Sequence, residues 1–333
     1  MSTVSFLAFV ATRADDSVET AVEELDDAEL PPGDVLVDVE WSSVNYKDAM
    51  VTLPGNRVAR RSPLVPGVDL AGRVLESPDP AFPPGTDVVV HGYDLGVGRH
   101  GGFATKARVP AAWVVPLPGG LTTRRAAAIG TAGFTAALSV EKLEKAGVRP
   151  GDGQVLVTGA SGGVGSMAVA ALAREGYEVV ASTGKRAAHD YLRLLGASDV
   201  VGRDGVAEAG RVLSTERWAG AVDCVGGGTL AAVLRALRYG GAVAASGLTA
   251  GPELQTSVYP FIVRGVSLLG VDSVQTPIDE RRRVWSIVQE LLPGTAVDAM
   301  VAKEVGLHEL PSELDDVLAA RVRGRVLVRP AAR

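Results

Sequence analysis

One stretch of the chain places closely spaced glycines between a short apolar run and a helix-forming segment. Residues 155–165 read Val-Leu-Val-Thr-Gly-Ala-Ser-Gly-Gly-Val-Gly, with glycines at positions 159, 162 and 165. Glycines lack side chains, so the backbone can approach a diphosphate, and the N-terminus of the following helix offers that anion N–H groups and a positive dipole end. We therefore predict a dinucleotide-binding turn. The alternative is a tight strand-to-helix turn that binds no ligand.

Apolar strands and helical segments alternate on both sides of this turn. The predicted strands are residues 154–158, 177–182, 199–201, 219–225, 241–246 and 266–271, and the predicted helices are residues 122–144, 165–175, 189–195 and 229–237. This alternation indicates an α/β fold with a doubly wound parallel sheet of the Rossmann type.

The first 120 residues differ, with short apolar runs separated by glycine and proline. Runs at 35–39, 72–75 and 87–90 stand between such breakers, which predicts a β-rich, barrel-like unit. The last 60 residues are mixed, with a predicted helix at 279–292 and a strand at 325–328 that we expect to return to the first unit. The predicted division is therefore 1–122, 123–275 and 276–333.

Composition narrows the classes of function open to the chain. A net charge of −6 over 333 residues argues against general nucleic-acid binding, which needs basic groups to meet phosphates. No stretch approaches about 20 uninterrupted apolar residues, so no membrane span is predicted, and residues 1–13 do not have a signal-peptide pattern. The single cysteine, Cys224, fits a reducing compartment. We expect a cytoplasmic protein.

The residues after the second predicted strand indicate which dinucleotide is bound. An NAD site usually ends this strand with Asp or Glu, which holds the ribose hydroxyls. Here the chain continues Ser182-Thr183-Gly184-Lys185-Arg186, and these hydroxyls and cations suit a 2′-phosphate because charge-assisted hydrogen bonds to phosphate are strong. NADPH is the predicted cofactor, with Arg203 as a further contact. The alternatives are that Lys185 and Arg186 begin a solvated helix and that Arg203 is a plain surface residue.

Several motifs spread over the chain resemble the medium-chain dehydrogenase/reductase superfamily. In order, they are residues 41–49 (Trp-Ser-Ser-Val-Asn-Tyr-Lys-Asp-Ala), 65–72 (Val-Pro-Gly-Val-Asp-Leu-Ala-Gly), 129–136 (Ile-Gly-Thr-Ala-Gly-Phe-Thr-Ala), the glycine turn, 189–192 (His-Asp-Tyr-Leu), 270–274 (Gly-Val-Asp-Ser-Val) and 324–328 (Gly-Arg-Val-Leu-Val). Within this superfamily the chain resembles the quinone-oxidoreductase branch, and most of all its acrylyl-CoA reductase group. The resemblance implies a GroES-like catalytic domain, formed by the N-terminal part and the C-terminal tail, and a Rossmann domain between them.

The same resemblance implies a set of residues that contact NADPH. They are Tyr46, Thr131, Ser161, Gly162, Gly163, Val164, Gly165, Thr183, Gly184, Lys185, Arg203, Leu248, Ile262 and Ser273.

The chain departs from the zinc alcohol dehydrogenases of this superfamily. Its first 120 residues contain no cysteine and two histidines, His91 and His100, whereas catalytic zinc in that branch needs Cys and His ligands there. The segment Gly67-Val68-Asp69 stands where that branch has Gly-His-Glu. We therefore expect no metal site.

The expected reaction is the reduction of a carbon–carbon double bond conjugated to a carbonyl group. Hydride reaches the β-carbon and negative charge moves to the carbonyl oxygen, which the protein must stabilise. Asn45 and Tyr46 are the predicted catalytic residues, because an amide can donate a hydrogen bond to that oxygen and a phenol can donate a hydrogen bond or a proton. The alternatives are a turn residue at 45 and a core tyrosine at 46. Lys47 and Asp48 could form a local ion pair.

The predicted substrate is a short enoyl thioester, acryloyl-CoA, which would become propionyl-CoA. Arg57, Arg60 and Arg61 crowd one loop, and arginine binds phosphates such as those of CoA. The alternative is a solvated basic loop. A quinone or enone reductase is the second hypothesis, and an NADPH-binding structural or sensing protein without turnover is the third. We expect a homodimer, because an exposed edge at the predicted last strand, 266–271, could pair with its copy.

Overall fold

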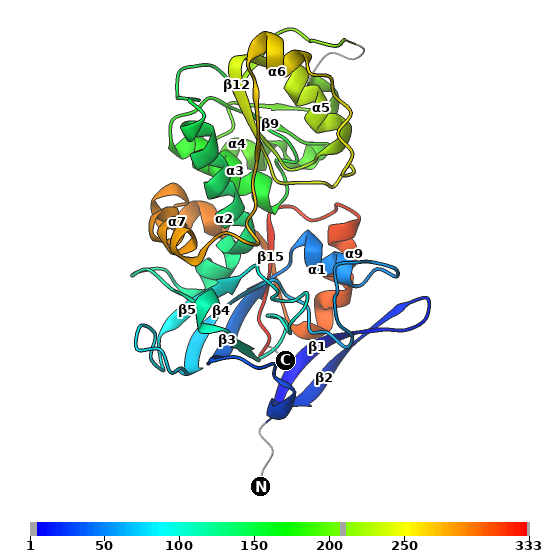
Figure 1. The fold of residues 1–333 in the computed structure, drawn as a ribbon, viewed down its shortest axis with the longest axis vertical. Coiled ribbons are helices and arrows are strands. Elements are labelled where there is room, and N and C mark those ends of the chain that lie inside the picture. Colours follow the sequence, from blue (N-terminus) through cyan, green and yellow to red (C-terminus); the bar gives the residue numbers. More distant parts are fainter. Residues whose placement is uncertain (1–4, 207–210, 332–333) are drawn as a thin grey trace. The chain divides into compact units, whose positions relative to one another are not determined.

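The computed structural model of the protein describes residues 5–206 and 211–331. The chain divides into two compact units (Figure 1). The first comprises Met1–Thr131, Val274–Ile287 and Val297–Arg333, and the second comprises Ala132–Ser273 and Val288–Ala296. Three further helices are α2 (Thr123–Lys145), α7 (Ile278–Leu291) and α8 (Gly294–Met300).

The main sheet of the first unit is built around one long strand, β3 (Val35–Ser43). The strand order is β14-β15-β3-β4-β5-β7, with β6 also paired to β3. The other strands are β4 (Asp69–Glu76), β5 (Asp87–His91), β6 (Lys106–Val109), β7 (Val115–Pro116), β14 (Val301–Val305) and β15 (Arg325–Val328). One edge of β3 pairs with β4, and the other pairs with β6 along its first half and with β15 at Ser42 and Ser43. A strand from the C-terminal end of the chain therefore joins the N-terminal sheet.

Alternation along β3 separates two apolar cores, because successive side chains of a strand point to opposite faces. Val35, Val37 and Val39 are buried in one core with residues of β4 and β5. Leu36 belongs to the other core, which contains residues of a hairpin and of two helices. These further elements are β1 (Ser5–Arg13), β2 (Val18–Asp26), α1 (Tyr46–Val51) and α9 (Leu310–Leu318), with short 3-10 turns η1 (Asp27–Glu29), η2 (Ala111–Trp113) and η5 (Leu307–Glu309).

The second unit contains a six-stranded parallel sheet with the order β10-β9-β8-β11-β12-β13. The strands are β8 (Val155–Val157), β9 (Val179–Ser182), β10 (Asp199–Val201), β11 (Trp218–Asp223), β12 (Leu237–Ala245) and β13 (Ser267–Gly270). The helices are α3 (Gly163–Arg174), α4 (His189–Leu194), α5 (Gly227–Ala236) and α6 (Tyr259–Arg264), with 3-10 turns η3 (Arg186–Ala188) and η4 (Arg203–Gly205). The order runs outward in both directions from β8 and β11, as in a Rossmann sheet. The predicted fold class is confirmed.

Local differences from the predicted elements have identifiable causes. The predicted helix at 122–144 is two helices that meet at Gly130, whose φ of 45° and ψ of −152° are not helical. Helix α3 begins at Gly163, ahead of the predicted start at 165, because the glycine turn itself enters the helix. Residues 5–26, for which no strand is predicted, form the paired strands β1 and β2, and acidic residues interrupt the apolar pattern of β2.

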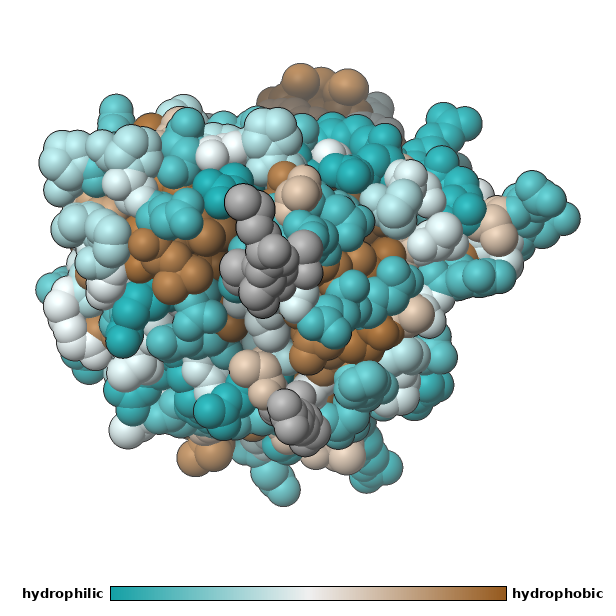
Figure 2. Space-filling model, turned by 90° about the horizontal axis from the view of Figure 1, so that it is seen from below, coloured by the Kyte–Doolittle hydropathy of each residue, from teal (hydrophilic) through white to brown (hydrophobic). Residues whose placement is uncertain are grey.

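The surface seen from below the view of Figure 1 is mostly hydrophilic, with separate apolar areas between the polar side chains (Figure 2). Across residues 5–206 and 211–331, no helix combines the length and the apolar composition that crossing a membrane requires.

Candidate functional site

The glycine turn of the second unit joins β8 to α3. Gly159 has a φ of +59°, a conformation that glycine adopts without strain. A Cβ on Gly165 would lie 2.6 Å from the Cα of Ala160, so the first turn of α3 packs directly against the loop. The Ser166 hydroxyl donates a 2.7 Å hydrogen bond to the carbonyl oxygen of Gly162 and closes the turn. The strand, turn and 12-residue helix thus have the form that binds a diphosphate at a helix N-terminus.

Hydroxyl groups and cations gather beyond the neighbouring strand β9. The Ser161 and Thr183 hydroxyl oxygens lie 2.9 Å apart, and the backbone N–H of Lys185 donates to the Thr183 hydroxyl over 3.1 Å. The guanidinium of Arg203 covers Gly184, where a Cβ would lie 2.8 Å from its Nε. Burial, and then the neighbouring Arg203, lower the pKa of Lys185. Two cations beside two hydroxyls form a favourable place for a phosphate.

The remaining cofactor contacts implied for this unit lie elsewhere in it. Leu248 follows β12, is 52% exposed, and has its Cα 3.1 Å from where a Cβ on Gly226 would stand. It therefore lies beside the turn that follows β11. Ile262 is on α6 and is 73% exposed, whereas Ser273 is buried beyond the end of β13.

Asn45 and Tyr46 stand at the start of α1 in the first unit. Tyr46 is 37% exposed, so it is not a core tyrosine. The amide nitrogen of Asn45 donates to Oδ2 of Asp69 over 2.7 Å and to the carbonyl oxygen of Ser43 over 3.2 Å. Its Oδ1 accepts from Nη1 of Arg325 over 3.2 Å. The structure therefore places the Asn45 side chain in an internal network and leaves the Tyr46 side chain partly at the surface.

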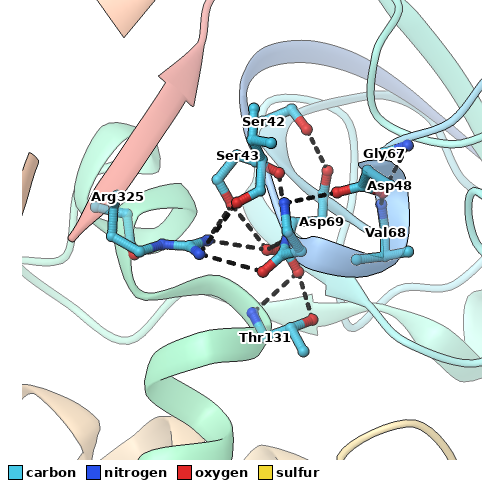
Figure 3. Close-up of polar contacts among 11 residues, drawn as sticks. Ser42, Ser43, Asp48, Gly67, Val68, Asp69, Thr131 and Arg325 are labelled. Carbon is cyan, nitrogen blue, oxygen red and sulfur yellow. Dashed lines mark hydrogen bonds and ion pairs between the residues drawn. The ribbon is translucent and has the colours of Figure 1, made fainter. Parts of the chain in front are cut away.

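Asp69 is the centre of that network and is fully buried (Figure 3). Its Oδ2 accepts from the Ser43 hydroxyl over 2.7 Å and lies 3.4 Å from Nη2 of Arg325, which is also buried. Its Oδ1 accepts from the backbone N–H of Thr131 over 2.9 Å and from the Thr131 hydroxyl over 2.5 Å. Both hydrogen-bond donors of Thr131, an implied cofactor contact, are thus directed at Asp69.

Asp48 is a second buried carboxylate next to this network. Its Oδ1 accepts from the backbone N–H groups of Gly67 and Val68 over 3.1 and 2.9 Å, and its Oδ2 accepts from that of Asn45 over 2.8 Å. Burial, together with the nearby Asp69 carboxylate, raises the pKa of Asp48 to about 7 despite these hydrogen bonds. The expected role of Asp48 as a local ion-pair partner of Lys47 is therefore wrong, since the carboxylate turns inward to backbone donors.

The arginine loop of the first unit is exposed at all three predicted positions. Arg60 forms an ion pair with Asp94, and Nε of Arg61 donates to the carbonyl oxygen of Pro63 over 3.2 Å. Nη2 of Arg13 on β1 donates to the carbonyl oxygen of Ala59, which fixes this strand to the loop.

The two histidines of the first 120 residues are engaged in hydrogen bonds. Nε2 of His91 accepts from the indole N–H of Trp285 over 2.9 Å, and burial lowers the pKa of His91. Nδ1 of His100 accepts from the backbone N–H of Val65 over 2.9 Å. Burial first, and then Arg61, lower the pKa of His100 to about 4. Among the residues that the structure describes, no three His, Cys, Asp or Glu side chains are grouped so as to hold a metal ion.

Comparisons with known proteins place this fold among the oxidoreductases of the alcohol dehydrogenase type. Residues 31–119 match the family described as alcohol dehydrogenase GroES-like domain, and residues 163–290 match the family described as zinc-binding dehydrogenase. The chain is 48% identical to acrylyl-CoA reductase AcuI of Ruegeria pomeroyi, over 97% of this chain and 98% of the relative. It is also 48% identical to YhfP of Bacillus subtilis, whose name places it with the quinone oxidoreductases, over 99% of this chain and all of the relative. The chain belongs to the medium-chain dehydrogenase/reductase superfamily, in its quinone-oxidoreductase branch. The predicted family and the predicted enzyme class, oxidoreductase, are confirmed.

Solved structures of relatives hold nicotinamide dinucleotides. YHDH of Escherichia coli K-12 was crystallised with bound NADPH; it is 47% identical, with a TM-score of 0.93 over 97% of this chain and 99% of that one. The structure of Bacillus subtilis YhfP has NAD bound, and its TM-score is 0.94 over 98% of this chain and all of that one.

The centre of the first-unit network is not predicted from the sequence. Asp69 belongs to the 65–72 motif and departs from the zinc branch, and Arg325 belongs to the 324–328 motif and opens a predicted strand, but neither pattern indicates that the two side chains meet. One local signal was present, because an arginine that opens the otherwise apolar strand β15 requires a buried partner.

Proposed function

We propose that the chain is a zinc-independent, NADPH-dependent reductase of the activated double bond of a short enoyl thioester, converting acryloyl-CoA to propionyl-CoA. The proposal rests above all on the cluster of Ser161, Thr183, Lys185 and Arg203 beside the glycine turn, in a chain related along its whole length to an acrylyl-CoA reductase. The cofactor domain is proposed as residues 123–275 and the catalytic domain as residues 1–122 and 276–333.

In this proposal the N-terminal turn of α3 holds the diphosphate, and the hydroxyl–cation cluster holds the 2′-phosphate of NADPH. NADPH, when bound, supplies the hydride that reduces the β-carbon of the substrate. The hydroxyl-rich end of β9 favours NADPH over NADH, because a carboxylate that would hold the free ribose hydroxyls is replaced there by Thr183 and Lys185.

Tyr46 is the proposed donor to the thioester oxygen. Its phenol is partly exposed at the start of α1, and it can donate a hydrogen bond to the oxygen that gains negative charge. Asn45 is the proposed second donor. Its 3.2 Å bond to the Ser43 carbonyl is longer than its 2.7 Å bond to Asp69, so the former is the contact that it would exchange for substrate. A proton added at the α-carbon, from the Tyr46 phenol or from solvent, completes the reaction.

Arg57 and Arg61, with Arg60, are the proposed contacts to CoA phosphates. Their exposed positions on one loop support this assignment. Arg60 is the least available of the three for a phosphate, because it already pairs with Asp94. Zinc independence is supported by the engagement of His91 and His100 in hydrogen bonds inside the unit. The match to the zinc-binding dehydrogenase family covers residues 163–290, beyond the N-terminal region where the zinc branch holds its catalytic ligands.

The experiment follows NADPH oxidation with acryloyl-CoA, crotonyl-CoA and a benzoquinone in parallel, with NADH in place of NADPH as a second arm. We expect the fastest turnover with acryloyl-CoA and NADPH, and an unchanged rate after treatment with a chelator. Rapid turnover of the quinone alone would favour a quinone reductase. Binding of NADPH without oxidation by any substrate would favour a sensing or structural protein. A chelator-induced loss that added zinc restores would overturn zinc independence.

The role of the arginine loop is tested with a truncated substrate. In Arg57→Ala and Arg61→Ala variants, KM for acryloyl-CoA should rise about tenfold, the effect of losing a charge-assisted phosphate contact. KM for an acryloyl thioester of N-acetylcysteamine, which has no phosphate, should not change. Arg108→Ala, which removes an arginine paired with Glu76, is the control. Equal effects on both thioesters would mean that the loop does not bind CoA phosphates.

A further inference from the structure

Asp223 is the last residue of β11 and Thr158 directly follows β8, and these are the two central strands of the parallel sheet. In the register of this pair, Val222 lies opposite Val157, so the next residues along each strand are Asp223 and Thr158. The strand order reverses between these strands, and ligands of such sheets bind in the crevice outside the carboxyl ends at this point. Both side chains are buried.

The carboxylate of Asp223 is shared between the turns that follow the two strands. Its Oδ1 accepts from the Thr158 hydroxyl over 2.6 Å, and its Oδ2 accepts from the backbone N–H of Gly226 over 2.7 Å. The Thr158 hydroxyl in turn accepts from the backbone N–H of Cys224 over 3.1 Å. One buried acid therefore connects the glycine turn after β8 to the turn after β11.

The same two turns are in direct contact. A Cβ on Gly159 would lie 3.1 Å from Cγ2 of Val225. The turn after β12 joins them, because the backbone N–H of Ser246 donates to the carbonyl oxygen of Asp223 over 3.0 Å. A shift of the carboxylate would therefore be transmitted to the turns after β8 and β11, and the backbone of Asp223 contacts the turn after β12.

We propose that Asp223 is a positioning residue for the cofactor, which acts through Thr158 to fix the glycine turn in the conformation that binds the diphosphate. Both carboxylate oxygens are engaged by the chain itself, so Asp223 need not touch the dinucleotide. A buried carboxylate is unusual at a crevice that binds an anion, because it places negative charge near that anion. Its hydrogen bonds to both turns explain why a carboxylate stands there. This inference rests on the proposed NADPH binding.

The test measures the dissociation constant for NADPH by fluorescence titration in Thr158→Val, Thr158→Ser, Asp223→Asn and the Thr158→Val/Asp223→Asn double variant. We expect Thr158→Val and Asp223→Asn each to weaken NADPH binding by about tenfold, as expected for loss of a hydrogen bond to a buried charge. The double variant should bind NADPH no more weakly than the single variant with the lower affinity, because both substitutions remove the same hydrogen bond between Thr158 and Asp223. Thr158→Ser, which keeps the hydroxyl, should bind as the wild type does.

Ser198→Ala is the matched control. It also removes a hydroxyl hydrogen-bonded within this unit, to the carbonyl oxygen of Val179 at the start of β9, away from the crevice. It should lower thermal stability without changing NADPH affinity. The inference would be overturned if Thr158→Val bound NADPH with wild-type affinity, or if Thr158→Ser bound it as weakly as Thr158→Val. If Asp223→Asn does not fold, the affinity of Thr158→Val is the deciding measurement. Failure of the wild type to bind NADPH would instead overturn the proposed function.

Discussion

Gly130 lies so close to Asp69 that no side chain fits between them. A Cβ at position 130 would overlap Oδ2 of Asp69 and lie 2.9 Å from its Cγ, and Gly130 has a φ of 45°. The kink of α2 at this glycine brings the backbone N–H of Thr131 to Oδ1 of Asp69. The kink and the buried carboxylate therefore depend on each other.

Gly130→Ala should destabilise the protein strongly, because it adds a steric overlap to an unfavourable backbone conformation. We expect a loss of about 3 kcal/mol, measured as a decrease in Tm. Gly147→Ala is the control, since Gly147 also has a positive φ, of +95°, but open space around its missing Cβ. It should cost about 1 kcal/mol from the backbone alone. Equal losses in the two variants would contradict the overlap with Asp69.

Asp48 should make the protein less stable as the pH rises towards 7. Its pKa in the folded state is about 7, against an ordinary value of 3.8, so the folded protein keeps a proton that the unfolded chain has lost. The contribution of Asp48 to the free energy of unfolding is therefore complete below pH 3.8 and is lost as the pH rises through 7, a change of roughly 4 kcal/mol. Thermal unfolding of the wild type and of Asp48→Asn is compared across pH 5–8. The difference in Tm between them isolates the contribution of Asp48, because other groups, such as His100, titrate in both proteins. The Tm of the wild type relative to the variant should fall over this range, and a constant difference would mean that Asp48 does not titrate there.

Lys185→Ala should remove the preference for NADPH. Loss of the cation beside Thr183 and Arg203 should weaken NADPH binding by about tenfold or more and leave NADH binding nearly unchanged, because only NADPH carries the 2′-phosphate. Binding is measured by fluorescence titration with both nucleotides. Lys145→Ala serves as the control, since this lysine pairs with Glu141 on an exposed helix end. A parallel loss of NADH affinity would argue against a 2′-phosphate contact.

Tyr46→Phe should slow the reaction more than it weakens binding of the thioester. The phenol is the proposed donor to the developing negative charge, and removal of such a donor should lower kcat about a hundredfold. Steady-state kinetics with acryloyl-CoA and NADPH measure kcat and KM separately. Tyr239→Phe, at a tyrosine that is 79% exposed, is the matched control. An unchanged kcat would remove Tyr46 from the catalytic residues.

Strand β13 should mediate a homodimer. It is the last strand in the sheet order, and Leu268 on it is 38% exposed, near the exposed apolar side chains of α6 in sequence. Light scattering coupled to size exclusion should give twice the 34.4 kDa mass of the chain for the wild type and the single mass for Leu268→Asp. Leu194→Asp, which changes an exposed leucine on α4, should remain dimeric. A monomeric wild type would refute the prediction.

The second unit was predictable because its signals are local. The glycines at 159, 162 and 165 and the residues Thr183 to Lys185 each follow a strand directly, and the carboxyl ends of neighbouring parallel strands lie together. The hydroxyl oxygens of Ser161 and Thr183, each implied as an NADPH contact, lie 2.9 Å apart although 22 residues separate them. The kink at Gly130 was not predictable, because the sequence on both sides of it has a helical pattern. The residue that requires the kink, Asp69, is distant in the sequence.

The Rossmann sheet and the glycine turn could be predicted from the sequence because their periodicity and spacing act over a few residues, and the family followed from the resemblance of its motifs. The contact of Arg325 with Asp69, across 256 positions of the chain, and the inward turn of Asp48 to Gly67 and Val68 arise from the folding of distant segments together. Whether a carboxylate is solvated or buried depends on which strands pair, here β15 with β3, and no short stretch of sequence encodes that pairing.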